Sequence, residues 1–302
     1  MNLAEKIKEL HASKYKFVIV SSGGGSNAIA SLLKVPGASN TVLEAYIPYA
    51  KESLDFYLMK KPDFYASKDT SLRMAARAYS AAKKIDQESS LNHLLGVSIT
   101  ASLSTTYEKR GDHKFHIALQ TRDFSKSISC KLEKGKRTRE EEEELVTAFV
   151  VNLLAECSEL EHDYPEIPEE VVFDEVKAEK GWAELMSNKI NYVLSEDASP
   201  ELIFPGAFYP YHDGHKAMKN LAEQETGKKI FFEICIQNVD KPPISYHQIK
   251  KTVMQFNDSE NWVLTKAGKF SEKSKLFPNS TFIIGADTCL LYTSDAADEG
   301  HC

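Results

Sequence analysis

Two histidines three residues apart follow a turn rich in glycine, proline and aromatic residues, in the stretch FPGAFYPYHDGH at 204–215. A short apolar strand precedes this stretch, and the residues after it predict a helix that Gly227 ends. His212 and His215 therefore fall at or just before the first helical turn, where three or four backbone N–H groups have no partner within the helix. Such a position favours an anionic ligand.

Three kinds of site can use this histidine pair. A metal site needs more ligands, and no cysteine or carboxylate group is obviously partnered with the two imidazoles. A structural histidine pair is the second alternative, but it leaves the glycines on either side unexplained. Phosphate binding accounts for every part, because Gly206 lets the backbone approach a phosphate, Pro210 fixes the loop and Gly214 removes a side chain between two N–H donors. We therefore expect a phosphate site with no metal ligands of its own.

The combined pattern G-x-F-x-P-x-H-x-G-H, between a strand and a helix, resembles the HxGH nucleotidyltransferase superfamily, which includes the nicotinamide-nucleotide adenylyltransferases and cytidylyltransferases. The matching residues are Gly206, Phe208, Pro210, His212, Gly214 and His215. The stretch KLFPNSTFIIGADT at 275–288 resembles a later strand of that family and places Asp287 near the accepting nucleotide. The resemblance implies that His212 and His215 are catalytic and that the rest of the pattern, with Ala207 and Asp287, binds nucleotide.

The same resemblance implies a Rossmann-like parallel sheet and a reaction. A pyridine mononucleotide attacks the α-phosphorus of a nucleoside triphosphate, ATP or CTP, and pyrophosphate leaves; Mg²⁺ accompanies the triphosphate. The family's closing I-S-x-T-x-x-R element is missing, because CLLYTSDAADE at 289–299 resembles translated sequencing adapter. We therefore expect 289–302 to be a foreign tail, the transferase domain at 201–288 to be incomplete, and transfer by this chain to be weak or absent.

A second glycine-rich turn, SSGGGS at 21–26, follows the apolar run YKFVIV and precedes a helix. This geometry presents backbone N–H groups to an anion or polar ligand, although glycines also serve simply to turn the chain. The glutamate run that opens a later predicted helix, TREEEEEL at 138–145, has a capping-box spacing and is expected to be a solvated helix start.

The stretches at 21–54 and 95–103 resemble the C-terminal domain of CinA, which deamidates nicotinamide mononucleotide. By that resemblance Ser21 is the candidate nucleophile, and Tyr49 and Thr100 belong to the active site. The family's acidic residue falls on Val20 and its lysine on Leu54, so that no base for Ser21 can be named. Amidase activity in the first half, or nucleotide binding without turnover, are therefore alternative functions.

The composition sets the remaining limits. A chain of 302 residues is long enough for two domains, and 42% hydrophobic with 27% charged residues is typical of a globular protein. A formal charge of −7 argues against a nucleic-acid or membrane-surface binder. No stretch is apolar enough to span a bilayer and no signal-peptide core is found, so we expect a cytoplasmic protein with free thiols.

Alternating strands and helices predict an α/β protein of two domains. A CinA-like layer domain is expected at 1–160. An acidic, proline-containing linker follows at 161–200, with one helix at 181–194. The truncated nucleotidyltransferase domain follows at 201–288. The sequence is compatible with a homo-oligomer and does not give the number of subunits.

Overall fold

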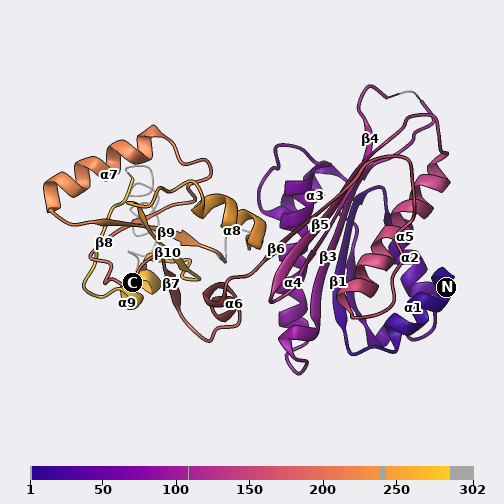
Figure 1. Cartoon of the computed structure of the whole chain (residues 1–302), viewed down its shortest axis with the longest axis horizontal. Helices are drawn as coiled ribbons and strands as arrows, with labels where there is room; N and C mark the ends of the chain where they lie inside the picture. Colours follow the sequence, from indigo (N-terminus) through magenta and orange to yellow (C-terminus); the bar gives the residue numbers. More distant parts are fainter. Residues whose placement is uncertain (1, 108, 238–242, 286–302) are drawn as a thin grey trace, which may run out of the picture. The chain divides into compact units, whose positions relative to one another are not determined.

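The computed structural model of the chain describes residues 2–107, 109–237 and 243–285. Within these ranges the chain forms two compact units, each with its own sheet (Figure 1). The described residues up to Ser187, with 243–248, make the first unit, and those from Asn188 to 237 and from Ile249 to 285 make the second. Both units are mixed α/β, as the sequence predicts.

The first unit is built on a sheet of six strands in the order β2-β1-β3-β4-β5-β6. Its strands are β1 (Lys16–Gly23), β2 (Val42–Tyr46), β3 (Leu94–Ser102), β4 (His113–Gln120), β5 (Phe124–Leu132) and β6 (Val171–Lys177). The first three are mutually parallel, and the other three extend the sheet by antiparallel pairing. The turns after β1 and β3 therefore meet at one edge of the sheet, where parallel strands commonly present a site.

Helices cover both faces of this sheet (Figure 1). The helices of this unit are α1 (Leu3–His11), α2 (Ser26–Lys34), α3 (Lys51–Leu58), α4 (Lys68–Ile85), α5 (Arg139–Cys157) and α6 (Lys180–Met186), with 3₁₀ turns at Ala38–Asn40 and Leu91–His93. Helices α1, α2 and α5 pack together on one face, and α4 packs along β3 and β4 on the other. The main core lies under α5, where Phe115 and Phe149 are fully buried with their ring centroids 5.2 Å apart.

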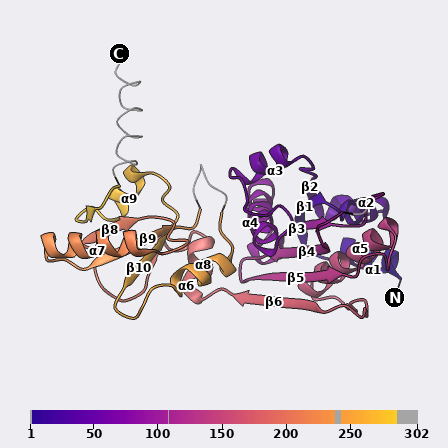
Figure 2. The same ribbon diagram turned by 90° about the horizontal axis from the view of Figure 1, so that it is seen from above.

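The segment predicted as a linker is largely part of the first unit. Strand β6 pairs with β5 along its whole length, at the edge of the sheet (Figure 2). Most of its side chains are exposed or half-buried. Because an edge strand can carry polar residues on its open side, its composition is hard to distinguish from that of a linker. The predicted helix at 181–194 is also shorter, since α6 ends at Met186 and β7 begins at Tyr192.

The second unit has a five-stranded sheet in the order β11-β8-β9-β10-β7. Its elements in chain order are β7 (Tyr192–Leu194), β8 (Leu202–Pro205), α7 (Asp213–Thr226), β9 (Ile230–Cys235), α8 (Tyr246–Val253), β10 (Asn261–Thr265), α9 (Phe270–Leu276) and β11 (Thr281–Phe282); α8 begins in the first unit. All pairs are parallel except that of β10 with β7. The chain adds β9 and β10 on one side of β8 and returns to its other side with β11, which is the strand order of a Rossmann-like half.

Candidate functional site

The histidine stretch begins at the carboxyl end of β8, the strand at which the order reverses. Ligands of open α/β sheets bind outside the carboxyl ends of the strands at such a reversal. Gly206 donates its N–H to the Glu233 carbonyl oxygen at 3.0 Å, which ties the start of the loop to the end of β9. The predicted site therefore lies at the topologically expected edge of the second sheet.

His212 and His215 are brought together at the first turn of α7. His212 is the N-cap residue, and its Nδ1 accepts a hydrogen bond from the Gly214 N–H at 3.2 Å. The His215 Nδ1 accepts from the His212 N–H at 3.3 Å, and the two rings stack with centroids 3.8 Å apart. Because both Nδ1 atoms act as acceptors, each neutral ring carries its proton on Nε2, which remains a donor for a ligand.

Aromatic packing fixes the orientation of His215. Its ring stacks on Tyr211 at 5.8 Å and meets Phe208 edge-on at 5.0 Å. Burial, with a smaller contribution from the neighbouring His212, lowers the pKa of His215 below its usual value. His212 itself is exposed. One imidazole is therefore held in place and neutral near pH 7, and the other is open to solvent.

The other residues predicted to bind nucleotide differ in their burial. Phe208 is 2% exposed and adopts a positive φ of 47°, so it anchors the loop in the core of the second unit. Ala207, Pro210 and Gly214 are exposed, and Gly206 is half-buried. A Cβ on Gly206 would lie 2.5 Å from the Phe208 ring, so this glycine is needed for the packing of the loop itself. Asp287 lies outside the described residues.

A glutamine that the sequence did not indicate holds the loop from behind. Gln255 accepts a hydrogen bond from the Tyr211 N–H and donates one to the Phe208 carbonyl oxygen, both at 2.9 Å. The Tyr211 hydroxyl donates to Glu260 at 2.6 Å, and Lys219 of α7 binds the same carboxylate at 3.1 Å. These contacts come from residues more than 40 positions apart, and no local pattern predicts them.

No group of three or more His, Cys, Asp or Glu side chains within the described ranges is placed to hold a metal ion. Of the same residues, none forms a helix long and apolar enough to cross a bilayer.

The glycine-rich turn of the first unit has a different occupant. The Glu143 carboxylate of α5 accepts the Gly25 N–H at 2.8 Å and the Asn27 N–H at 3.5 Å, which caps the start of α2. Arg139 pairs with the same carboxylate at 2.8 Å. Anion-binding amides are thus present here, as the pattern predicts, but a carboxylate of the chain itself fills them.

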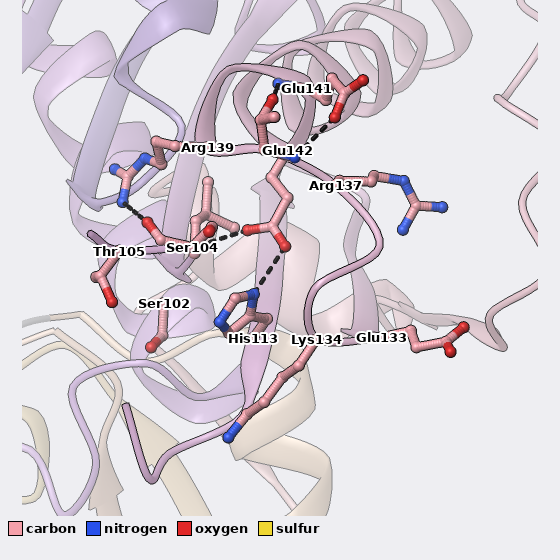
Figure 3. A network of polar contacts seen from close by, with 12 residues as sticks. Ser102, Ser104, Thr105, His113, Glu133, Lys134, Arg137, Arg139, Glu141 and Glu142 are labelled. Carbon is pink, nitrogen blue, oxygen red and sulfur yellow. Dashed lines mark hydrogen bonds and ion pairs between the residues drawn. The ribbon is translucent and has the colours of Figure 1, made fainter. Parts of the chain in front are cut away.

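The neighbouring Glu142 corrects the expectation of a solvated glutamate run. It is fully buried, and it accepts hydrogen bonds from the Ser104 N–H at 2.6 Å and from His113 Nδ1 at 2.8 Å (Figure 3). Arg139 donates to the Ser104 carbonyl oxygen. The start of α5 therefore fixes the loop that follows β3, a role that a run of identical residues does not reveal.

The predicted residues of the first unit do not converge. Ser21 is fully buried, donates to the Gly24 carbonyl oxygen at 3.2 Å and pairs in register with Ile99 of the α5-side core. The serine that pairs with Thr100, and shares its face of the sheet, is Ser22. The period-two alternation that places Phe17 and Ile19 in this core also predicts the inward direction of Ser21.

The other residues around that predicted site either donate their hydroxyl groups to backbone carbonyl oxygens or lie on the surface. Thr100 donates its hydroxyl to the Tyr65 carbonyl oxygen at 2.8 Å, and Ser22 donates to that of Pro48 at 2.9 Å. Tyr49 is 69% exposed. Val20 and Leu54, where the resembled family has charged residues, are buried core positions.

A serine and a lysine that the sequence did not single out do meet in this unit. Lys109 donates to the Ser102 hydroxyl at 2.8 Å and to the Leu103 carbonyl oxygen, at the end of β3. Burial lowers the pKa of Lys109; Glu142 opposes this shift, and the nearby cations Arg139 and Lys134 add to it. A lysine with a lowered pKa beside a serine hydroxyl can take the proton of that hydroxyl.

No protein-family model matches the chain, and no curated protein matches its sequence. Solved structures similar to part of the chain include the competence/damage inducible protein CihA from Agrobacterium tumefaciens, at 15% identity and a TM-score of 0.42 over 52% of this chain and 99% of that one. Another is a competence or damage-inducible protein from Enterobacter asburiae, at 15% identity and a TM-score of 0.39 over 52% and 94%. A third is a competence-damaged protein (CinA) superfamily protein from Escherichia coli, at 12% identity and a TM-score of 0.37 over 49% and 81%.

Proposed function

We propose that the second unit binds a nucleoside triphosphate at the start of α7 and transfers its nucleotidyl group to a pyridine mononucleotide. The observation that carries this proposal is the stacked pair of imidazoles, His212 and His215, beside the strand at which the sheet order reverses. Their Nδ1 atoms are occupied by backbone N–H groups, which leaves both Nε2–H groups for phosphoryl oxygens. The positive end of the α7 dipole adds to the attraction.

The proposed step needs no covalent enzyme intermediate. A phosphate oxygen of the mononucleotide forms a bond to the α-phosphorus, and the bond between that phosphorus and the bridging oxygen breaks, so that pyrophosphate leaves with the electron pair. Mg²⁺ bound to the triphosphate would offset its charge. His212 and His215 would orient the triphosphate and donate hydrogen bonds to oxygens that gain charge in the transition state.

The test is pyrophosphate release from ATP or CTP with nicotinamide or nicotinate mononucleotide, together with the affinity for each triphosphate. The proposal expects both signals to depend on His212. A matched control is Glu225→Ala, an exposed substitution at the other end of α7. Triphosphate binding that depends on His212, without release of pyrophosphate, would support the triphosphate site but not the transfer step. No binding at all, or binding that His212→Ala leaves unchanged, would contradict the assignment of this site.

A second candidate function, amide hydrolysis in the first unit, is favoured by the contact between Ser102 and Lys109. The neutral Lys109 amine would take the hydroxyl proton as Ser102 Oγ bonds to the amide carbon. The proton would pass to the departing ammonia as the C–N bond breaks, and water would then cleave the ester by the same route.

Ammonia release from nicotinamide mononucleotide tests this candidate and separates its two nucleophiles. Ser102→Ala and Lys109→Met should abolish the release, while Lys131→Met, a control at a side chain that is 72% exposed, should retain it. Loss of activity in Ser21→Ala with full activity in Ser102→Ala would instead support the nucleophile that the sequence resemblance implies.

A further inference from the structure

A cavity of about 380 Å³ lies in the first unit, away from the turns that follow β1 and β3. Its lining comes from α1, from α5 and from the segment after α5. The residues are Leu3, Lys6, Ala148, Asn152, Glu161, Asp163, Tyr164, Pro165 and Glu166. Its volume falls in the lower part of the range for small-molecule sites, roughly 300 to 1,000 Å³.

A buried lysine forms one wall of this cavity. Lys6 is 6% exposed, and its ammonium donates to Asn152 Oδ1 at 2.5 Å. The same oxygen accepts the Asp163 N–H at 2.7 Å, and the Asn152 amide nitrogen donates to the Ala148 carbonyl oxygen at 2.8 Å. The Asn152 oxygen is therefore shared between two donors, and it is a neutral acceptor that brings no negative charge to the cation.

Lys6 forms no ion pair with any carboxylate of the described part of the chain. An ammonium has three N–H donors, and a buried charge is costly unless it is paired and hydrogen-bonded. A ligand that brings an anionic oxygen into the cavity would supply the missing partner. Lys6 is the one cation among the described residues that line the cavity, so it alone would bind this anion.

The rim of the cavity carries the opposite charge. Glu161, Asp163 and Glu166 are all exposed carboxylates that line it. Three negative charges around one positive charge disfavour a polyanion such as phosphate and favour a ligand with a cationic end. The remaining wall, made by Leu3, Tyr164 and Pro165, is largely apolar.

We propose that this cavity binds a free zwitterionic amino acid with an apolar side chain. The ligand carboxylate pairs with Lys6, the ligand ammonium meets the rim carboxylates, and the side chain packs on Tyr164 and Pro165. This site does not depend on the proposed transferase function, since it lies in the other unit and uses none of the same residues.

Calorimetric titration with L-leucine and L-phenylalanine tests the proposal. L-Leucinamide lacks the carboxylate and N-acetyl-L-leucine lacks the ammonium, so each should bind at least about tenfold more weakly than L-leucine. Inorganic phosphate should not bind. No binding of either amino acid at millimolar concentration, or equal binding of L-leucine and phosphate, would overturn the proposal.

Variants of the full chain assign the binding to the cavity. Lys6→Met removes the cation with little change in length and should abolish L-leucine binding, whereas Lys8→Met, at an exposed position of the same helix, should not. If Lys6→Met does not fold, the double variant Glu161→Gln, Asp163→Asn decides, because it keeps Lys6. It should weaken L-leucine binding about tenfold but should not weaken the binding of N-acetyl-L-leucine, which has no ammonium for the rim carboxylates to meet. Unchanged L-leucine affinity in both sets of variants would overturn the assignment.

Discussion

The turn before α2 and the turn before α7 share one plan, a parallel strand followed by a glycine-containing turn and the exposed amides of a new helix. They differ in what meets those amides. At α2 the Glu143 carboxylate occupies them, whereas at α7 the imidazoles of His212 and His215 cap the backbone through their Nδ1 atoms. The same local geometry therefore serves the internal structure of one unit and, in our proposal, a ligand site in the other.

The residue that makes the difference lies far away in the sequence. Glu143 is 118 positions from Gly25. It belongs to a run of five glutamates at 140–144, and the sequence of that run does not show which of them are buried. In contrast, the two imidazoles lie within the motif that they serve. A glycine-rich turn thus indicates that amides are available but does not identify their partner, and the partner decides whether the turn contributes to stability or to binding.

The largest expected effect is on nucleotidyl transfer, when a histidine of the turn before α7 is replaced. His212→Ala should lower the rate of nucleotidyl transfer by about 10² to 10³, because one donor to the charged transition state is lost. The same change should lower the free energy of unfolding by no more than about 1 kcal/mol, since the side chain is exposed and acts only as a helix cap. Pyrophosphate release and thermal melting measure the two effects. A large loss of stability would mean that the histidines are structural, and the contrast between the turns would fail.

At the turn before α2, we expect a loss of stability rather than of catalysis. Glu143→Ala leaves the Gly25 amide and the Arg139 guanidinium without their partner, and should cost about 2 kcal/mol of unfolding free energy. Denaturant unfolding of this variant, beside the exposed Glu144→Ala as a control, gives the number. Equal stability of the two variants would show that the carboxylate is not needed there.

A smaller effect is expected from adding one methyl group between the histidines. A Cβ at Gly214 would lie 3.1 Å from the His212 ring, so Gly214→Ala should displace that ring and weaken triphosphate binding about tenfold. Gly227→Ala at the other end of α7 has space around it but a positive φ of 67°, and should affect stability more than affinity. Titration with a fluorescent triphosphate compares the two. If Gly227→Ala weakened triphosphate binding more than Gly214→Ala, the nucleotide would have to bind elsewhere.

The smallest effect concerns the acid stability of the first unit. Burial, helped by Lys114 and Lys68, lowers the pKa of His116 to about 4, whereas the side chain in the unfolded chain titrates near its ordinary pKa of 6.5. The unfolded state therefore takes up the proton first, and stability present above pH 6.5 is lost as the pH falls toward 4. Because the ring is partly exposed, the loss should be about 1 kcal/mol. His116→Gln should remove this part of the pH dependence in denaturant unfolding at pH 7 and pH 4.5, and an unchanged slope would contradict it.

Much of the architecture follows from local patterns. The apolar run YKFVIV at 15–20 lies largely in β1 and the apolar run HLLGVSIT at 93–100 largely in β3, and Thr138 with Glu141 forms the capping box that its spacing predicts. Strand β6 was missed because an edge strand with exposed side chains has the composition of a linker. Local signals therefore identify buried strands and helix starts better than elements at the edge of a sheet.

The candidate site shows the same division. The order of His212, Gly214 and His215 predicted their convergence at a helix start, because all three lie within one turn of each other. Ser21 was assigned by resemblance without regard to strand alternation, which turns it toward the core. The contact of Lys109 with Ser102 depends on the path of the loop after β3, and no spacing rule predicts that path.

Backbone amide chemical shifts measured during titration with ATP and Mg²⁺ test the contrast between the two turns most directly. The account predicts that the amides of Gly214, His215 and Lys216 shift with saturable dependence on the nucleotide, while those of Gly25 and Asn27 stay in place because Glu143 already holds them. Shifts at Gly25 and Asn27 with none at the start of α7 would contradict it.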